Sequence, residues 1–184
     1  MRLCVFCGSK TGDDPRFSHA AIETGTLLAQ RGIGVVYGGG RVGLMGVLAD
    51  AARAAGGEVI GVIPQSLAER EVAHSGLSQL HVVDSMHDRK ALMAELSAGF
   101  IALPGGFGTL EEFCEVITWS QLGIHTKPCG ILNVAGYFDN LIGMFDYAGE
   151  RGFISSENRK IVLEAEKPHE LIERMLQLTE VGLR

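Results

Sequence analysis

The sequence has little positive charge and no long apolar run. It carries 16 lysines and arginines against 22 acidic residues, a net charge of −6. An acidic chain lacks the basic surface that general nucleic-acid binding needs, so we expect no nucleic-acid partner. No apolar stretch approaches the roughly 20 residues that span a membrane, and we expect no membrane partner. The first expected strand begins too early to leave room for a signal peptide, which predicts a cytoplasmic protein.

Cysteine is also scarce, with four residues in 184. Cys4 and Cys7 have the C-x-x-C spacing of redox and zinc motifs. Both fall in an expected strand, where residues three apart face opposite sides of the sheet and cannot pair. We therefore expect buried, unpaired thiols. The six histidines show no metal-binding spacing, so no metal site is expected.

What the sequence does contain is a regular alternation of strand and helix patterns. We expect strands at residues 3–7, 34–37, 59–63, 80–83, 100–103 and 130–134. Helices are expected at residues 15–30, 43–55, 86–97, 110–122, 137–149 and 168–178, with Asp14 and Ser85 as N-caps. Residues 65–79 are the least regular. The alternation predicts the α/β class, a doubly wound parallel sheet with helices on both faces, in one domain covering 1–184.

The segment 104–112 is the most informative. Gly105, Gly106 and Gly108 follow an apolar run and precede a helix, an arrangement in which backbone N–H groups can approach a phosphate. The same turn carries Glu112, a carboxylate that phosphate binding does not need. An alternative is a capping box formed by Thr109 and Glu112. A capping box explains those two residues but not the three glycines together, and it is compatible with a catalytic role.

Two other glycine turns follow expected strands. Gly8 and Ser9 end the first strand, where a ligand contact and a plain turn are both open. Residues 38–43 match G-x-G-x-x-G and open a helix. A dinucleotide site would also need an acid at the end of the next strand, which here ends without one. NAD binding is therefore disfavoured, whereas a phosphate or ribose contact stays open.

The helix expected at 86–97 carries two cations near its beginning. Met86, Arg89, Lys90 and Met93 fall at i, i+3, i+4 and i+7 and share one face. Cations at this end oppose the helix dipole. The functional interpretation is an anion clamp, in which Arg89 offers the better fork. The alternative is a solvated pair of charges.

With these residues in view, the chain resembles the LOG (Lonely Guy) family, the cytokinin nucleotide-activating phosphoribohydrolases, which often carry the label lysine decarboxylase. The family signature P-G-G-x-G-T-x-x-E stands at 104–112, and its M-H-x-R-K stands at 86–90. The resemblance runs nearly end to end. It includes residues 8–9, 37–40, 43–46, 118–125 and 133–138.

The resemblance implies a Rossmann-like fold, a homodimer and an enzyme that needs no cofactor. The substrate would be a nucleoside 5′-monophosphate with adenine or an N6-substituted adenine as base. Hydrolysis of its N-glycosidic bond would release free base and ribose 5-phosphate. By the same resemblance Arg89 and Glu112 would be catalytic. Substrate contacts would come from Gly8, Ser9, Gly39, Gly40, Glu71, Met86, Arg89, Lys90, Pro104, Gly105, Gly106, Phe107, Gly108, Thr109, Leu110, Glu111, Glu112 and Thr118.

The sequence departs from the family pattern at two positions. Lys10 stands where many members have a small polar residue, and Ala98 where an Asp is common. Both departures leave the preferred base open. The choice between hormone production and nucleotide salvage is open as well. The alternative function is a non-catalytic nucleotide or cofactor carrier. A carrier would need the glycines but not the pair of Arg89 and Glu112.

Overall fold

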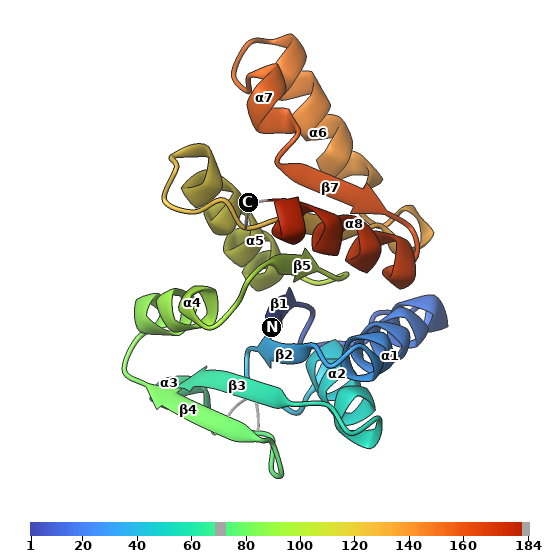
Figure 1. The fold of residues 1–184 in the computed structure, drawn as a ribbon, viewed down its shortest axis with the longest axis vertical. Coiled ribbons are helices and arrows are strands. Elements are labelled where there is room, and N and C mark those ends of the chain that lie inside the picture. The colour runs from blue at the N-terminus through green and yellow to red at the C-terminus, as the bar shows by residue number, and fades with distance from the viewer. Residues whose placement is uncertain (69–72, 182–184) are drawn as a thin grey trace.

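The computed structural model describes residues 1–68 and 73–181 and contains a parallel seven-stranded sheet (Figure 1). The strands lie in the order β4-β3-β2-β1-β5-β6-β7. Their bounds are Arg2–Phe6 (β1), Gly34–Tyr37 (β2), Val59–Pro64 (β3), Gln79–Val83 (β4), Phe100–Ala102 (β5), Cys129–Leu132 (β6) and Val162–Ala165 (β7).

Helices cover both faces of this sheet, as the alternating pattern predicts. They are Pro15–Gln30 (α1), Gly43–Ala54 (α2), Gln65–Ala68 (α3), Met86–Glu95 (α4), Phe107–Gln121 (α5), Asp139–Glu150 (α6), Ser156–Arg159 (α7) and Pro168–Val181 (α8), with a 3-10 turn at Val134–Gly136 (η1). Figure 1 shows α1 and α2 on one side of the strands and α4 and α5 on the other. The predicted doubly wound α/β fold is confirmed.

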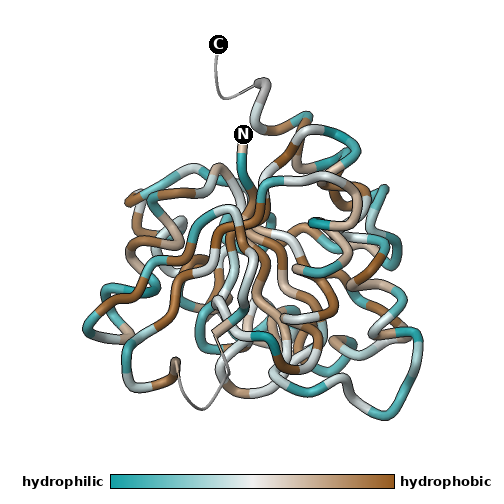
Figure 2. Tube along the Cα trace, turned by 90° about the horizontal axis from the view of Figure 1, so that it is seen from below, coloured by the Kyte–Doolittle hydropathy of each residue, from teal (hydrophilic) through white to brown (hydrophobic). Residues whose placement is uncertain are grey.

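Each face of the sheet has its own hydrophobic core, because successive strand residues point to opposite sides. Leu3, Val5 and Cys7 pack with buried residues of α1, α2 and α8, whereas Cys4 and Phe6 pack with those of α4 and α5. Figure 2 shows the hydrophobic stretches gathered along the central strands. The two cysteines thus face opposite cores, as expected, and all four thiols are free.

Local signals at the helix beginnings are confirmed as well. The Asp14 carboxylate accepts a hydrogen bond from the backbone N–H of Arg16, with Pro15 at the first helical position of α1. The Ser85 hydroxyl accepts one from the N–H of Asp88 at the beginning of α4. These side chains satisfy backbone donors that the first helical turn leaves unpaired.

Several expectations about the elements are wrong, including the first strand, which ends at Phe6 before Cys7, and the last helix, which runs to Val181 instead of residue 178. Helix α5 begins at Phe107, not at residue 110, because Gly106 caps it without a side chain that the sequence could display. The sixth strand ends at Leu132 and is followed by η1, so it does not reach residue 134. The edge strand β7 and the one-turn helices α3 and α7 are additional, and each is only four residues long.

The sheet reverses its direction of growth between β1 and β5. The chain adds β2, β3 and β4 on one side of β1 and β5, β6 and β7 on the other. At such a point the loops after the two central strands diverge and leave a crevice at the carboxyl edge of the sheet. The Gly8 N–H donates to the Pro104 carbonyl oxygen at 3.0 Å, which ties the two loops together at the base of this crevice.

No helix in the described part of the chain has the length and apolar character to cross a membrane.

Candidate active site

A cavity of about 180 Å³ opens at this crevice. The loop after β1, the beginning of α4 and the glycine turn before α5 all contribute to its wall. Its lining residues are Cys7, Gly8, Ser9, Met45, Met86, Arg89, Gly106, Phe107, Gly108, Thr109 and Glu112. The cavity thus brings together both sequence signatures, which lie on separate helices.

The beginning of α5 forms one wall of the cavity. Gly106 is the N-cap residue and makes no side-chain cap hydrogen bond. The N–H groups of the first helical turn have no acceptor within their own helix, and the helix dipole makes this end positive. A Cβ at Gly106 or Gly108 would meet nothing within 4 Å, so open space lies beside these glycines. The arrangement suits a bound anion.

Gly105 is required for a different reason. A Cβ at this position would overlap the Thr109 hydroxyl and lie 2.8 Å from the backbone nitrogen of Gly8. The two loops therefore approach each other more closely than any side chain would allow. This close approach brings Gly8 and Ser9 beside the glycine turn.

The capping-box interpretation of Thr109 and Glu112 is wrong. With the N-cap at Gly106, Thr109 is the third helical residue and Glu112 lies in the second turn. A capping box instead needs its hydroxyl residue at the N-cap and its acid three residues later. Glu112 is nevertheless only 8% exposed. Because helix capping does not account for this buried carboxylate, its position beside the cavity calls for a functional explanation.

Arg89 is buried from solvent and fixed by the sheet. The residue is 6% exposed. Its Nε donates to the carbonyl oxygen of Val62 at 3.1 Å and its Nη2 to that of Gly38 at 2.9 Å. A Cβ at Gly38 would overlap this same Nη2. The solvated-charge alternative is therefore wrong for Arg89, and the glycine turn at 38–43 makes room for its guanidinium.

Arg89 and Glu112 form an ion pair at the cavity wall. The Nη1 atom of Arg89 lies 3.7 Å from Oε1 of Glu112. In a site with little water, opposite charges at this distance attract each other more strongly than they would at an exposed surface. Burial, and then the charge of Glu112, raise the pKa of the Cys7 thiol above its usual range. Cys7 is therefore a neutral wall residue and not a thiolate nucleophile.

Lys90 does not line this cavity. Its Nζ lies 2.5 Å from Oε1 of Glu111 and 3.1 Å from Oε1 of Glu115, both on α5. Burial by itself would lower the pKa of Lys90, but the hydrogen bonds to Glu111 and Glu115 and the charges of these two residues together raise it. Lys90 thus links α4 to α5 next to the pair formed by Arg89 and Glu112.

A second cavity of about 340 Å³ adjoins the first and shares Gly8, Ser9 and Gly106 with it. Pro104 and Gly105 also line it, together with Lys10, Phe17 and Tyr137. One of the two departures from the family pattern, Lys10, therefore lies beside the site.

The remaining predicted contact residues lie elsewhere. Within residues 1–68 and 73–181, neither cavity is lined by Gly39, Gly40, Leu110, Glu111 or Thr118. The Gly39 carbonyl accepts a hydrogen bond from the His74 N–H at 3.0 Å, and the Thr118 hydroxyl donates to the Cys114 carbonyl at 2.7 Å. Glu71 lies outside the described residues.

Sequence reasoning missed Cys7, Met45, Phe17 and Tyr137 as wall residues. Cys7 follows directly after β1 at the switch point, which is the signal that points to it. Met45 and Tyr137 fall in segments 43–46 and 133–138, which match the family pattern but carry no reactive group that would have singled them out.

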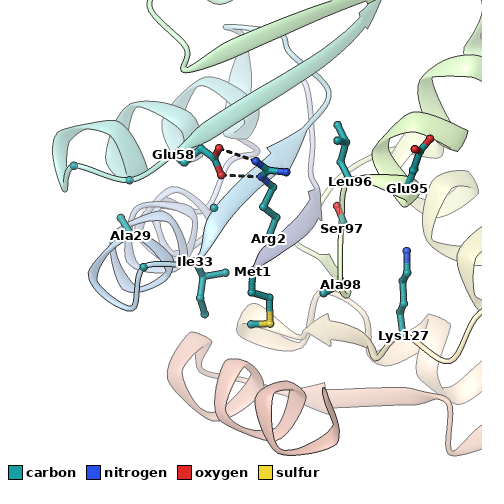
Figure 3. Close-up of a pocket in the computed structure, with 14 residues that line it drawn as sticks. Met1, Arg2, Ala29, Ile33, Glu58, Glu95, Leu96, Ser97, Ala98 and Lys127 are labelled. Atoms are coloured by element: carbon teal, nitrogen blue, oxygen red, sulfur yellow. Dashed lines mark hydrogen bonds and ion pairs between the residues drawn. The ribbon is translucent and has the colours of Figure 1, made fainter. Parts of the chain in front are cut away.

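A larger hollow of about 720 Å³ lies at the opposite, amino edge of the sheet (Figure 3). Two of its cations already have partners: Arg2 Nε lies 2.8 Å from Oε2 of Glu58, and Lys127 donates to the Ala94 carbonyl at 2.7 Å. Ligands of open α/β sheets bind at the carboxyl edge. We therefore place the site in the cavity of about 180 Å³ that Arg89 and Glu112 line. Ala98, the second departure from the family pattern, lines the amino-edge hollow and is remote from Glu112.

Comparisons with known proteins find similarity over most of the chain. A family model described as "Possible lysine decarboxylase" matches residues 45–175. The chain is 50% identical over 178 residues to a probable cytokinin riboside 5′-monophosphate phosphoribohydrolase of Oryza sativa subsp. japonica, covering 97% of this chain and 80% of the relative. It is 51% identical over 174 residues to a cytokinin riboside 5′-monophosphate phosphoribohydrolase of Arabidopsis thaliana, covering 95% and 82%.

Solved structures share the fold at lower identity. The molybdenum cofactor binding protein of Rippkaea orientalis superposes with a TM-score of 0.72 at 22% identity, covering 96% of each chain. The molybdenum cofactor carrier protein of Chlamydomonas reinhardtii gives the same TM-score at 20% identity, again with 96% coverage of each chain. At these identities the likeness concerns the fold alone.

Proposed function

The chain belongs to the LOG family of cytokinin riboside 5′-monophosphate phosphoribohydrolases, and we propose that its switch-point cavity is the active site of this activity. The enzyme hydrolyses the N-glycosidic bond of adenosine 5′-monophosphates, including N6-substituted ones, and releases free base and ribose 5-phosphate. The observation that supports this site most strongly is the buried pair of Arg89 and Glu112 beside the beginning of α5, where no side chain caps the helix.

Glu112 is the residue that acts on the reacting centre. Breaking the bond between C1′ and the base leaves the bonding electrons on the base and builds positive, oxocarbenium-like charge on the ribose. A carboxylate held beside the sugar stabilises that charge. The same carboxylate can take a proton from the water that attacks C1′, and the departing base takes up one proton to become the free base, so that one water is consumed. Neither step requires a metal or an organic cofactor.

Arg89 and the glycine turn hold the parts of this reaction in place. The N–H groups of Phe107, Gly108 and Thr109 bind the 5′-phosphate, and Gly106 and Gly108 leave space for it. Arg89 orients Glu112 through their ion pair, and its fixed guanidinium lines the same cavity. Binding of the phosphate supplies energy remote from the reacting bond and fixes the ribose against Glu112.

The alternative carrier function lacks a supporting observation. The carriers that share this fold are about 20% identical, whereas the hydrolases are about 50% identical over nearly the whole chain. A carrier would have no use for a buried acid beside the anion site. The label of the family model does not argue for decarboxylation, because the relatives at 50% identity are phosphoribohydrolases.

We also propose that the protein works as a homodimer in the cytoplasm. Phe107 is 92% exposed at the cavity rim, and Leu122 and Ile124 are exposed at the other end of α5. Exposed apolar residues of this kind are typical of subunit interfaces. Thr118, on the same helix, would then contact ligand in the partner's site. The four free cysteines suit a reducing compartment.

Chromatography of reaction mixtures tests the proposed function. Purified protein is incubated with AMP, with isopentenyladenosine 5′-monophosphate and with adenosine. We expect free base and ribose 5-phosphate from the two nucleotides, and much slower release of base from adenosine, which lacks the phosphate. Equal rates with adenosine would contradict the role of the phosphate site. Release of no base from any nucleotide would contradict the activity.

A further inference from the structure

We propose that Tyr137 is a positioning residue that orients the glycine peptide of the phosphate site, an inference that rests on the proposed function. Tyr137 lies on a different element from the catalytic pair, between η1 and α6. It belongs to the segment 133–138, which matches the family pattern but holds none of the predicted contact residues.

The backbone that presents Tyr137 is tightly constrained. Ala135 has a φ of 57° and is the single non-glycine residue with positive φ in the described part of the chain, and Gly136 follows with a φ of 73°. Such left-handed conformations persist where surrounding contacts enforce them. The enforcing contacts come from Asn133, whose side chain accepts from the Phe138 N–H and donates to Asp139, both at 2.7 Å.

The side chain of Tyr137 is fixed at both ends. Its hydroxyl donates to the Gly105 carbonyl oxygen at 2.6 Å. Its ring packs edge-to-face on Phe17 at 5.4 Å and on Phe138 at 4.9 Å between ring centroids. Aromatic pairs of this geometry are attractive beyond the area they bury. The ring is therefore held in one place although the residue is 43% exposed.

The hydrogen bond determines the direction of a backbone donor. The Gly105 carbonyl and the Gly106 N–H belong to one trans peptide, in which the two groups point in opposite directions. Two successive glycines would let this peptide rotate freely. The Tyr137 hydroxyl removes that freedom, because it holds the carbonyl on its own side.

The two cavities show which side that is. Tyr137 lines the cavity of about 340 Å³, Glu112 and Arg89 line the cavity of about 180 Å³, and Gly106 lines both. Holding the Gly105 carbonyl toward Tyr137 turns the Gly106 N–H away from the cavity that Tyr137 lines. This N–H then joins the donors of the first turn of α5 at the anion site. Tyr137 thus acts on phosphate affinity without touching the reacting atoms.

The substitution Tyr137→Phe removes the hydroxyl and keeps the ring. The control is Tyr147→Phe, which changes an exposed tyrosine of α6 that lines neither cavity. Calorimetric titration with ribose 5-phosphate measures phosphate affinity without turnover. We expect Tyr137→Phe to weaken this affinity about three- to tenfold, as for the loss of one hydrogen bond. The KM for AMP should rise by a similar factor, with kcat and the slow hydrolysis of adenosine little changed.

Three outcomes would overturn the inference. The first is unchanged ribose 5-phosphate affinity in a folded Tyr137→Phe protein. The second is an equal loss with adenosine, which would indicate a merely structural role. The third is a wild-type protein that does not bind ribose 5-phosphate. If the wild type binds ribose 5-phosphate but hydrolyses no nucleotide, the proposed function fails, and weaker binding by Tyr137→Phe still supports the positioning role.

Discussion

At the scale of single residues, the site depends on one guanidinium held by two carbonyl oxygens. Arg89 reaches Gly38 and Val62 because Gly38 has no side chain. The sequence indicated an anion clamp at Arg89, and the structure confirms that this side chain reaches the cavity. The sequence could not reveal the two carbonyl partners of Arg89, because they come from β3 and the loop after β2 and are distant from Arg89 in sequence. A glycine pattern that resembled a dinucleotide fingerprint therefore has a packing role.

The substitution Gly38→Ala tests this dependence. The added methyl would overlap the Arg89 Nη2 atom, so the guanidinium must leave the position in which it pairs with Glu112. We expect kcat/KM for AMP to fall by about a hundredfold, the scale at which small displacements of positioning groups act. Gly143→Ala is the matched control, since a Cβ there meets nothing within 4 Å. Equal activity of both variants would show that Arg89 tolerates displacement.

At the scale of elements, most helices and strands follow from the sequence pattern. The bounds of α1 and β2 agree with the prediction, and the N-caps Asp14 and Ser85 are confirmed. The beginning of α5 was missed because a glycine N-cap gives no side-chain signal, and the same error kept the capping box open for Thr109 and Glu112. The sequence could not predict the orientation of Lys90 either, because its partners lie on a helix about twenty residues later.

Lys90 links α4 and α5, and its removal tests how far this link sets the site. In Lys90→Met, Glu111 and Glu115 lose a partly buried cationic partner. We expect the free energy of unfolding to fall by about 1–3 kcal/mol, measured by urea denaturation. We also expect kcat to fall, because Arg89 and Glu112 lie on the same two helices. Lys160→Met, at an exposed lysine of the loop after α7, should change neither quantity.

At the scale of the whole molecule, buried thiols predict how stability depends on pH. Burial raises the pKa of Cys129 to about 12 from the ordinary 9.0, and burial first, then Glu112, raise those of Cys4 and Cys7. Above pH 9 the unfolded chain loses thiol protons that the folded chain keeps. The unfolded state then binds fewer protons, so stability is full below pH 9 and decreases as pH rises, by up to about 1.4 kcal/mol per pH unit for each thiol.

Urea denaturation between pH 8 and 10.5 measures this slope. Cys129→Ala should make this slope shallower than that of the wild type, by up to about 1.4 kcal/mol per pH unit. An unchanged slope would mean that Cys129 ionises equally in both states. Cys114→Ala is a useful control, because this thiol is half-buried, and we expect a smaller change in slope.

The arrangement of the whole chain explains why two distant signatures form one site. Residues 86–90 and 104–112 meet because the sheet reverses its growth between β1 and β5. Alternation of elements predicts a parallel sheet, but it does not fix the order of the strands, so this meeting could be inferred only through the resemblance. A single domain over 1–184 and a homodimer stay predictions, and light scattering of the purified protein tests the dimer.

The most direct test of the account is the turnover of isopentenyladenosine 5′-monophosphate by Glu112→Gln, measured as release of free base. Glutamine keeps the shape of the side chain but neither stabilises positive charge nor takes a proton. We predict that kcat falls by about 10²–10⁴-fold, while ribose 5-phosphate still binds and Glu150→Gln, at an exposed glutamate of α6, retains wild-type activity. Turnover near the wild-type rate in a folded Glu112→Gln protein would contradict the assignment of this carboxylate.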